Sequence, residues 1–181
     1  PATVPGCVHT DLLAAGLIDD PYLDRNELKI QWIGRTDWQY ASEFKVTQAF
    51  LAENERVDLV CDGLDTIARV ELNGKPAGES FSQHLPKRID VKSVLRAGKN
   101  QIVITFSSAL KYAEAMEKEH GTLPHVEKHP FNFIRKMACN FGWDWGPALI
   151  TAGIWQPISL EGWNELLLEA VRPLVVDIDQ D

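Results

Sequence analysis

The feature that most constrains the fold of this chain is a period of two in its apolar residues. Between Trp38 and Val46, even-numbered positions are mainly apolar and odd-numbered positions mainly polar, as expected of a strand with one face in a core. Several strands that each have one dry face predict antiparallel sheets packed against each other. The same spacing recurs at Val57, Leu59 and Cys61, at Ala68, Val70 and Leu72, and at Ile102, Ile104 and Phe106.

Turn residues separate these predicted strands. Asn73-Gly74 directly follows Leu72, and a type I′ hairpin turn needs positive φ at both central residues, which Asn and Gly adopt readily. Asp62-Gly63 and residues 98–100 interrupt the pattern in the same way, and a final strand is expected over residues 154–160. The spacing predicts a mainly β fold, an antiparallel β-sandwich of the jelly-roll type.

Two short helices are expected besides the strands. Thr10 is a suitable N-cap for a helix over Asp11–Ala15, and Gly16 would end it. After Ser107-Ser108, apolar residues at helical spacing predict an amphipathic helix that packs against the sandwich and ends at Gly121. Its predicted packing face consists of Ala109, Tyr112, Ala113 and Met116.

The length of the chain limits its domain organisation. With 181 residues and 45% hydrophobic composition, it is long enough for one well-filled core. A catalytic (β/α) barrel needs roughly 200 residues or more and does not fit. After residue 165 a new apolar strand pattern begins without a partner. We therefore expect one domain over residues 1–165 and, over 166–181, a connector and the first strand of a truncated second domain.

Charge and cysteine content narrow the possible partners and compartments. A formal net charge of −8 and a pI near 5.1 argue against nucleic acid or an anionic membrane surface, so a neutral ligand is expected. We expect free buried thiols, which are typical of a reducing compartment and favour the cytoplasm. Because the sequence starts at Pro1, a leader could have been removed, and the localisation stays open. The cysteines are Cys7, Cys61 and Cys139.

We predict neither a cofactor nor a bound metal. Three histidines precede the last predicted strand, but their spacing is not that of a zinc site. They are His120, His125 and His129.

The stretch FIRKMACNFGWDWGP, residues 133–147, places one carboxylate between two tryptophans, with Gly142 before the trio and Gly146-Pro147 after it. Sugars present apolar patches of C–H groups and sets of adjacent hydroxyl groups. An indole offers a flat face to the patches, and a carboxylate accepts hydrogen bonds from two adjacent hydroxyls. An exposed Trp143-Asp144-Trp145 on a loop of a rigid sandwich would meet both needs.

A purely structural role for these residues is an open alternative. Tryptophan in a β-sandwich usually fills the core, where we also place Trp32 and Trp38. If residues 143–145 were extended, both indoles would point to one side and Asp144 would only cap a turn.

Two residues near the trio also have alternative roles. Arg135 either orients Asp144 or pairs with a carboxylate at the edge of the core. Asn140 either donates to a sugar hydroxyl or stabilises a turn.

Several segments together resemble the amino-terminal domain of the β-mannosidases of glycoside hydrolase family 2. They are VPGCVHTDLLAAGLI, KIQWIG, DWQYASEF, DGLDTIARVELNG, FIRKMACNFGWDWGP and GIWQPISLEGW. The resemblance covers nearly the whole chain, and GWDWGP followed by GIW is its most specific part.

This resemblance implies a multidomain exo-enzyme: a jelly-roll domain of the sugar-binding, galactose-binding-like kind, an immunoglobulin-like sandwich that would begin after residue 165, and a carboxyl-terminal (β/α) barrel. The enzyme would release terminal β-linked mannose from an oligosaccharide with retention, through a covalent glycosyl-enzyme. The resemblance further implies that Asp144 binds hydroxyls of the terminal mannose and that Trp143 and Trp145 shape the pocket.

The catalytic glutamates are expected outside this chain. Asn164-Glu165 is similar to the Asn-Glu pair that carries the acid/base of the family, but here it lies in the predicted connector. A retaining mechanism also needs a second carboxyl at about 5–5.5 Å, and no candidate is identifiable. The isolated chain is therefore expected to be inactive.

Two functions remain possible from the sequence. The chain is either the non-catalytic domain of an exo-β-mannosidase that supplies part of the mannose subsite, or a self-sufficient carbohydrate-binding module. The strand pattern of the tail and the specific GWDWGP loop favour the first.

Overall fold

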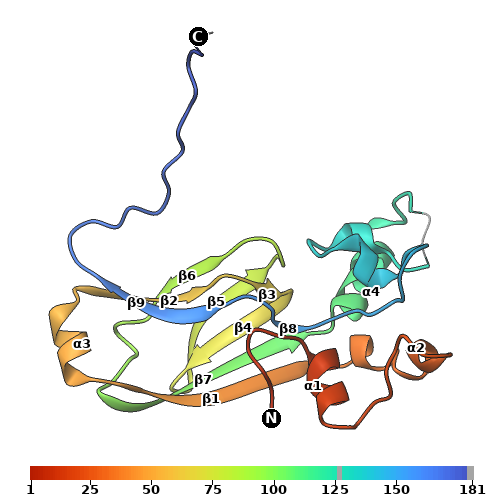
Figure 1. Ribbon diagram of the computed structural model, residues 1–181, viewed down its shortest axis with the longest axis horizontal. Helices are drawn as coiled ribbons and strands as arrows, with labels where there is room; N and C mark the ends of the chain where they lie inside the picture. Colours follow the sequence, from red (N-terminus) through yellow and green to blue (C-terminus); the bar gives the residue numbers. More distant parts are fainter. Residues whose placement is uncertain (126–127, 179–181) are drawn as a thin grey trace.

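The computed structural model describes residues 1–125 and 128–178. It is an antiparallel β-sandwich with short helices, which confirms the predicted fold class (Figure 1). One sheet has the strand order β1-β7-β4-β5, the other has the order β6-β2-β9, and β3 pairs with β8. The strands are β1 Trp38–Val46, β2 Arg56–Cys61, β3 Leu64–Asp65, β4 Ile67–Leu72, β5 Lys75–Phe81, β6 Lys87–Asp90, β7 Gly98–Ser107, β8 Gly153–Ile154 and β9 Ile158–Trp163.

The main core is formed by the residues whose spacing predicted the strands. β1 pairs with β7 along its whole length, from Trp38 opposite Phe106 to Val46 opposite Gly98. Because side chains alternate along each strand, one face of this sheet is directed at the other sheet. The members of the cluster that are at most 1% exposed are Val57, Cys61, Leu64, Val70, Leu72, Val91, Ile104 and Phe106.

The predicted hairpin after β4 is confirmed. Asn73 and Gly74 have φ angles of +53° and +75°, as a type I′ turn requires, and they connect β4 to β5. The side-chain amide of Asn73 also donates to the backbone oxygen of Val94 at 2.9 Å. The hairpin is thus fixed by its own backbone and by a contact from outside.

Two strand boundaries differ from the sequence prediction. Residues 98–100 are not a turn, because β7 already begins at Gly98 and pairs with the end of β1. The single strand expected over residues 154–160 is two strands, β8 and β9. They are separated at Trp155–Pro157, where proline lacks the backbone N–H that a continuous strand would use.

The helices begin and end close to the predicted residues. α1 starts at Val8, earlier than predicted, with Cys7 as its N-cap, and the Thr10 hydroxyl accepts from the Cys7 backbone N–H at 3.3 Å. Ser108 caps α4, because its side-chain oxygen accepts from the backbone N–H of Lys111 at 3.1 Å. The helices are α1 Val8–Ala14, α2 Asn26–Lys29, α3 Gln48–Glu53 and α4 Ala109–His120, and the 3-10 turns are η1 Ile33–Arg35, η2 Phe131–Phe133 and η3 Ala138–Phe141.

α4 does not pack against a face of the sandwich, so that part of the prediction is wrong. It lies at one end, beside the irregular segment that leads to β8 (Figure 1). Its buried residues cluster with Phe141 and Ile150, whereas Tyr112 and Met116 are only partly buried. α4 therefore forms a second, smaller core under this segment. Its buried residues are Ala109, Leu110 and Ala113.

Trp32 is also misplaced by the sequence reasoning. Its side chain is 47% exposed, because it precedes η1 and belongs to no strand with an inner face. Trp38 is partly buried and packs against the main core, as predicted.

The cysteines are free, as expected, but their burial differs. Only Cys61 is buried, and its burial raises the pKa of the thiol to about 12. Cys7 and Cys139 are partly exposed, so the prediction that every thiol is buried is wrong.

The chain continues beyond the sandwich as an extended segment. β9 ends at Trp163, and residues 164–178 leave from the end of the sandwich opposite α4 (Figure 1). They contain no helix or strand, and the expected domain boundary after residue 165 stays a prediction. Among the described residues, no helix is long and apolar enough to cross a membrane.

Candidate functional site

Trp143, Asp144, Trp145 and Gly146 form a tight turn at the surface. Two backbone hydrogen bonds close it, from Trp143 N to Gly146 O at 3.2 Å and from Gly146 N to Trp143 O at 3.3 Å. The extended conformation considered as an alternative does not occur, and Asp144 and Trp145 occupy the tip. Gly142 leads into the turn with φ of +107°, a conformation that residues with a side chain rarely adopt.

The side chains at the tip are open to solvent. Asp144 is exposed and forms no hydrogen bond with the described part of the chain, and Trp145 is 72% exposed. Trp143 is 37% exposed, and its ring meets that of Phe131 edge to face, with centroids 6.2 Å apart. One indole is therefore anchored while the second indole and the carboxylate remain available.

Arg135 and Asn140 lie in the same segment but do not contact Asp144. Arg135 is exposed, and its guanidinium pairs with no carboxylate of residues 1–125 or 128–178, so neither expected contact is formed. Asn140 lies in η3, and its buried Oδ1 has no hydrogen-bond partner among the described residues. Their proposed roles toward a ligand stay predictions.

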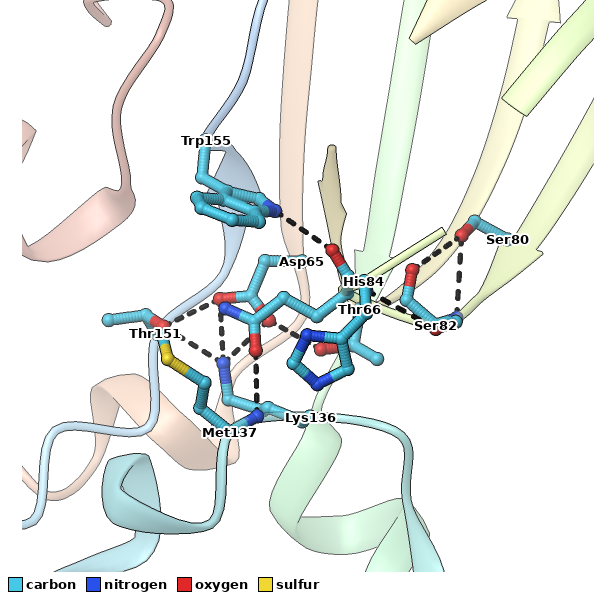
Figure 2. Close-up of polar contacts among 10 residues, drawn as sticks. Asp65, Thr66, Ser80, Ser82, His84, Lys136, Met137, Thr151 and Trp155 are labelled. Carbon is cyan, nitrogen blue, oxygen red and sulfur yellow. Dashed lines mark hydrogen bonds and ion pairs between the residues drawn. The ribbon is translucent and has the colours of Figure 1, made fainter. Parts of the chain in front are cut away.

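Residues just before η3 attach the segment to the sandwich. The backbone oxygen of Arg135 accepts from Gln83 N at 2.9 Å, and the backbone N–H of Met137 donates to Gln83 Oε1 at 2.8 Å. Trp155 Nε1 donates to the backbone oxygen of Gln83 at 3.1 Å (Figure 2). Gln83, which follows β5 and is buried, thus contacts both the start of the segment and the chain that returns from it.

Between these contacts lies a buried ion pair. Lys136 Nζ donates to both carboxylate oxygens of Asp65, at 2.5 and 2.6 Å, and to Thr151 Oγ1 at 2.9 Å (Figure 2). Thr151 Oγ1 donates to Asp65 Oδ2 at 2.5 Å, and the Thr66 hydroxyl also donates to Asp65. We call Asp65, Thr66, Lys136 and Thr151 the Asp65 cluster.

Burial dominates the electrostatics of this cluster. The side chains of Lys136 and Asp65 are 0% and 1% exposed. Burial lowers the pKa of Lys136, because the charged ammonium loses its hydration, and the adjacent Asp65 carboxylate opposes this effect. The pairing with several hydrogen bonds is what makes two buried charges tolerable.

His9, on α1, is buried next to the cluster and is 7% exposed. Its Nδ1 has no hydrogen-bond partner in the part of the chain that the structure describes. Burial, followed by repulsion from Lys136, lowers the pKa of His9 from 6.5 to about 4. His9 is therefore neutral at physiological pH.

The other end of the segment is held by Glu27 of α2 and by Gln31, which follows α2. The backbone N–H of Ala148 donates to Glu27 Oε1 at 2.7 Å, and Gln31 Nε2 donates to the backbone oxygen of Ala148 at 2.9 Å. Farther along, Ile150 is buried against α4. The turn is therefore carried on an irregular segment that is fixed at both ends.

A cavity of about 800 Å³ lies elsewhere in the molecule. It lies between the edges of β1 and β9 and is mainly apolar, with Tyr40, Phe44, Ile158 and Leu160 among its lining residues. No residue predicted to bind a ligand lines it.

The structure also shows the surroundings of Glu165 and of the three histidines, for which no catalytic or metal-binding role was expected. Glu165 is exposed just after β9, and its backbone N–H donates to Glu55 Oε2 at 3.4 Å. Among the described residues, no three His, Cys, Asp or Glu side chains are grouped so that they could hold a metal ion, and this includes His120, His125 and His129.

Sequence reasoning missed the residues that support the turn. Asp65, Gln83 and Lys136 are far apart in the chain, and nothing in the local pattern indicates that they meet. The one available signal in the sequence is that Asp65 and Thr66, both polar, lie between the apolar residues Leu64 and Ile67.

Comparison with known proteins agrees with the resemblance in the sequence. The family described as "Glycosyl hydrolase 2 galactose-binding domain-like" matches residues 1–156. The β-mannosidase of Mus musculus is 38% identical over 173 residues, which cover 91% of this chain and 20% of that protein. The β-mannosidase B of Thermothelomyces thermophilus is 39% identical over 179 residues, covering 96% and 20%. The chain thus spans about a fifth of the curated relatives that it matches.

A solved structure gives the same result. The crystal structure of the β-D-mannosidase from Dictyoglomus thermophilum superposes with a TM-score of 0.87 at 40% identity. The match covers 90% of this chain and 20% of that protein.

Proposed function

Because the chain belongs to glycoside hydrolase family 2 as a galactose-binding-like domain, we propose that it is the amino-terminal, non-catalytic domain of a retaining exo-β-mannosidase. In this proposal the Trp143–Gly146 turn forms part of the subsite that binds the terminal mannose of an oligosaccharide. The similarity to β-mannosidases at 38–40% identity supports the substrate class.

One observation carries the role of the turn: an exposed carboxylate stands between two indoles at the tip of a backbone-closed turn. Asp144 has no hydrogen-bond partner within the described residues, so its oxygens are free to accept from two adjacent sugar hydroxyls. Such charge-assisted bonds are shorter and stronger than neutral ones. The exposed faces of Trp143 and Trp145 suit the apolar C–H patches of a pyranose.

The turn is only one wall of a sugar pocket. Its tip, with Asp144 and Trp145, is exposed to solvent, whereas an exo-glycosidase has to enclose the terminal sugar. We propose that a (β/α) barrel elsewhere in the longer enzyme supplies the remaining walls and both catalytic glutamates. Retention would require those carboxyls to lie about 5–5.5 Å apart. The chain by itself would therefore be inactive.

Substitution of Asp144 in the longer enzyme tests this proposal. Asp144→Asn keeps the shape of the side chain but removes its charge, and each lost charge-assisted bond costs about 1.5–3 kcal/mol. We expect kcat/KM on an aryl β-mannoside to fall about ten- to a hundredfold per bond. Glu43→Gln is the matched control, because Glu43 is an exposed acid on β1 whose only ion pair among the described residues is with Lys99. Unchanged kcat/KM in Asp144→Asn would contradict the proposal.

Titration of mannose into this chain alone separates the proposal from a self-sufficient binding module. An isolated half-site should give no measurable heat, since most of the sugar would remain in water. Saturable binding at millimolar affinity or better would instead identify the chain as a complete carbohydrate-binding module.

A further inference from the structure

A single buried carboxylate connects the two ends of the segment that carries the Trp143–Gly146 turn. Asp65 lies on β3, outside that segment, and contacts Lys136 at its start and Thr151 at its end (Figure 2). We propose that Asp65 is a positioning residue, which holds both ends of residues 137–150 together and thereby fixes the place of Asp144.

The contacts of Asp65 are suited to this role. The Lys136 ammonium and the Thr151 hydroxyl both donate to Oδ2, at 2.6 and 2.5 Å, and they also contact each other at 2.9 Å. The three groups therefore form a closed triangle. Among the described residues, Asp65 is the only carboxylate that pairs with Lys136, so no other acid replaces it. Water is excluded from the pair, which strengthens each of these bonds.

The segment has little regular structure of its own, although Phe141 and Ile150 are buried under α4 and Ala148 is bonded to Glu27 and Gln31. Between residues 137 and 150 its only regular structure is the single 3-10 turn η3, and the Trp143–Gly146 turn closes through two backbone bonds. Trp143 contacts Phe131, but Asp144 and Trp145 are exposed. An irregular segment of this kind opens locally unless its ends are fixed, because closing the loop costs conformational entropy.

The effect on turnover rests on the proposed function. A displacement of about 1 Å of a group that binds the reacting sugar can lower the rate about a hundredfold. Loss of the Asp65 contacts would therefore weaken the subsite although Asp144 itself is unchanged.

Two variants break the contacts between Asp65 and the ends of residues 137–150 without leaving a buried charge unpaired. Thr151→Val removes the hydroxyl that joins Asp65 to the end of the segment and keeps the side chain's shape. Asp65→Asn combined with Lys136→Met neutralises both partners together. Thr105→Val is the matched control, because Thr105 lies on β7, outside residues 137–150, and its hydroxyl accepts a hydrogen bond from Gln39 Nε2 at 3.2 Å.

Hydrogen exchange of this chain, read residue by residue, measures the result. We expect amides of residues 137–150 to exchange at least about tenfold faster in Thr151→Val and in the double variant. Amides of β4 and β7 should keep their wild-type rates, and Thr105→Val should leave residues 137–150 unchanged. Unaltered exchange in 137–150 would refute the proposal. A uniform increase that includes β4 and β7 would also refute it, since it would show only a loss of global stability.

Kinetics of the longer enzyme then test separately whether Asp144 binds the sugar and whether the Asp65 contacts hold Asp144 in place. We expect Thr151→Val to lower kcat/KM on an aryl β-mannoside about tenfold. If Asp144→Asn leaves kcat/KM unchanged, the proposed function is wrong, but hydrogen exchange still tests whether the Asp65 contacts hold residues 137–150. If Asp144→Asn impairs turnover and Thr151→Val leaves it unchanged, the positioning role is overturned.

Discussion

His9 should make the stability of this domain depend on pH. Its imidazole is buried beside the Lys136 ammonium, and its pKa is lowered from 6.5 to about 4. In the unfolded chain the same group titrates at its ordinary value. Between these two pKa values the unfolded state binds a proton that the folded state does not, so the free energy of unfolding decreases as the pH falls.

The magnitude follows from the size of the shift. One pKa unit corresponds to about 1.4 kcal/mol. Relative to pH 7 and above, His9 should therefore cost about 2 kcal/mol of stability at pH 5 and about 3 kcal/mol at pH 4. Below pH 4 the loss levels off, because His9 is then protonated in both states.

Urea denaturation followed by circular dichroism, at pH 7, 6, 5 and 4, measures this effect. His9→Gln is the reference, because glutamine retains a polar side chain but does not titrate. Subtracting the two free energies of unfolding at each pH removes the contribution of the carboxylates, which is common to both proteins. We expect the difference to change by about 3 kcal/mol in favour of His9→Gln between pH 7 and pH 4. A difference that is constant over this range would refute the reasoning.

Two further substitutions test the packing around the site. Phe141→Ala should lower the free energy of unfolding by about 3–5 kcal/mol, because Phe141 is 2% exposed in the small core under α4, and chemical denaturation checks this. Gly63→Ala should cost about 1–3 kcal/mol, because an added Cβ would lie 2.5 Å from Trp155 Nε1. The displaced indole should then change the tryptophan emission, and an unaltered spectrum with wild-type stability would contradict the close approach.

The strands were predictable because their pattern is local. Alternation within β1 identifies its inner face without knowledge of its partners, and Asn73-Gly74 defines a turn by its own conformational preference. Such signals need only a few consecutive residues. They failed at Trp32, which precedes a 3-10 turn and has no strand neighbours to define a face.

The support of the site was not predictable, because it depends on residues that are distant in sequence. Lys136 follows Arg135, and both are expected at the surface from their chemistry, yet one is buried and the other exposed. Asp65 and Lys136 meet only in the folded chain, where the carboxylate compensates the charge of the buried ammonium. For Trp143-Asp144-Trp145 the residues alone left an exposed loop and an extended, structural role open, and the structure shows a turn with Asp144 exposed at its tip.

A crystal structure of the longer enzyme with mannose in its subsite would test the central claim most directly. The account predicts a carboxylate oxygen of Asp144 at about 2.5–3.0 Å from a hydroxyl of the terminal mannose. It also predicts the face of at least one neighbouring indole against the sugar's C–H groups. A bound mannose with Asp144 still surrounded by solvent, and no contact to the turn, would contradict the account.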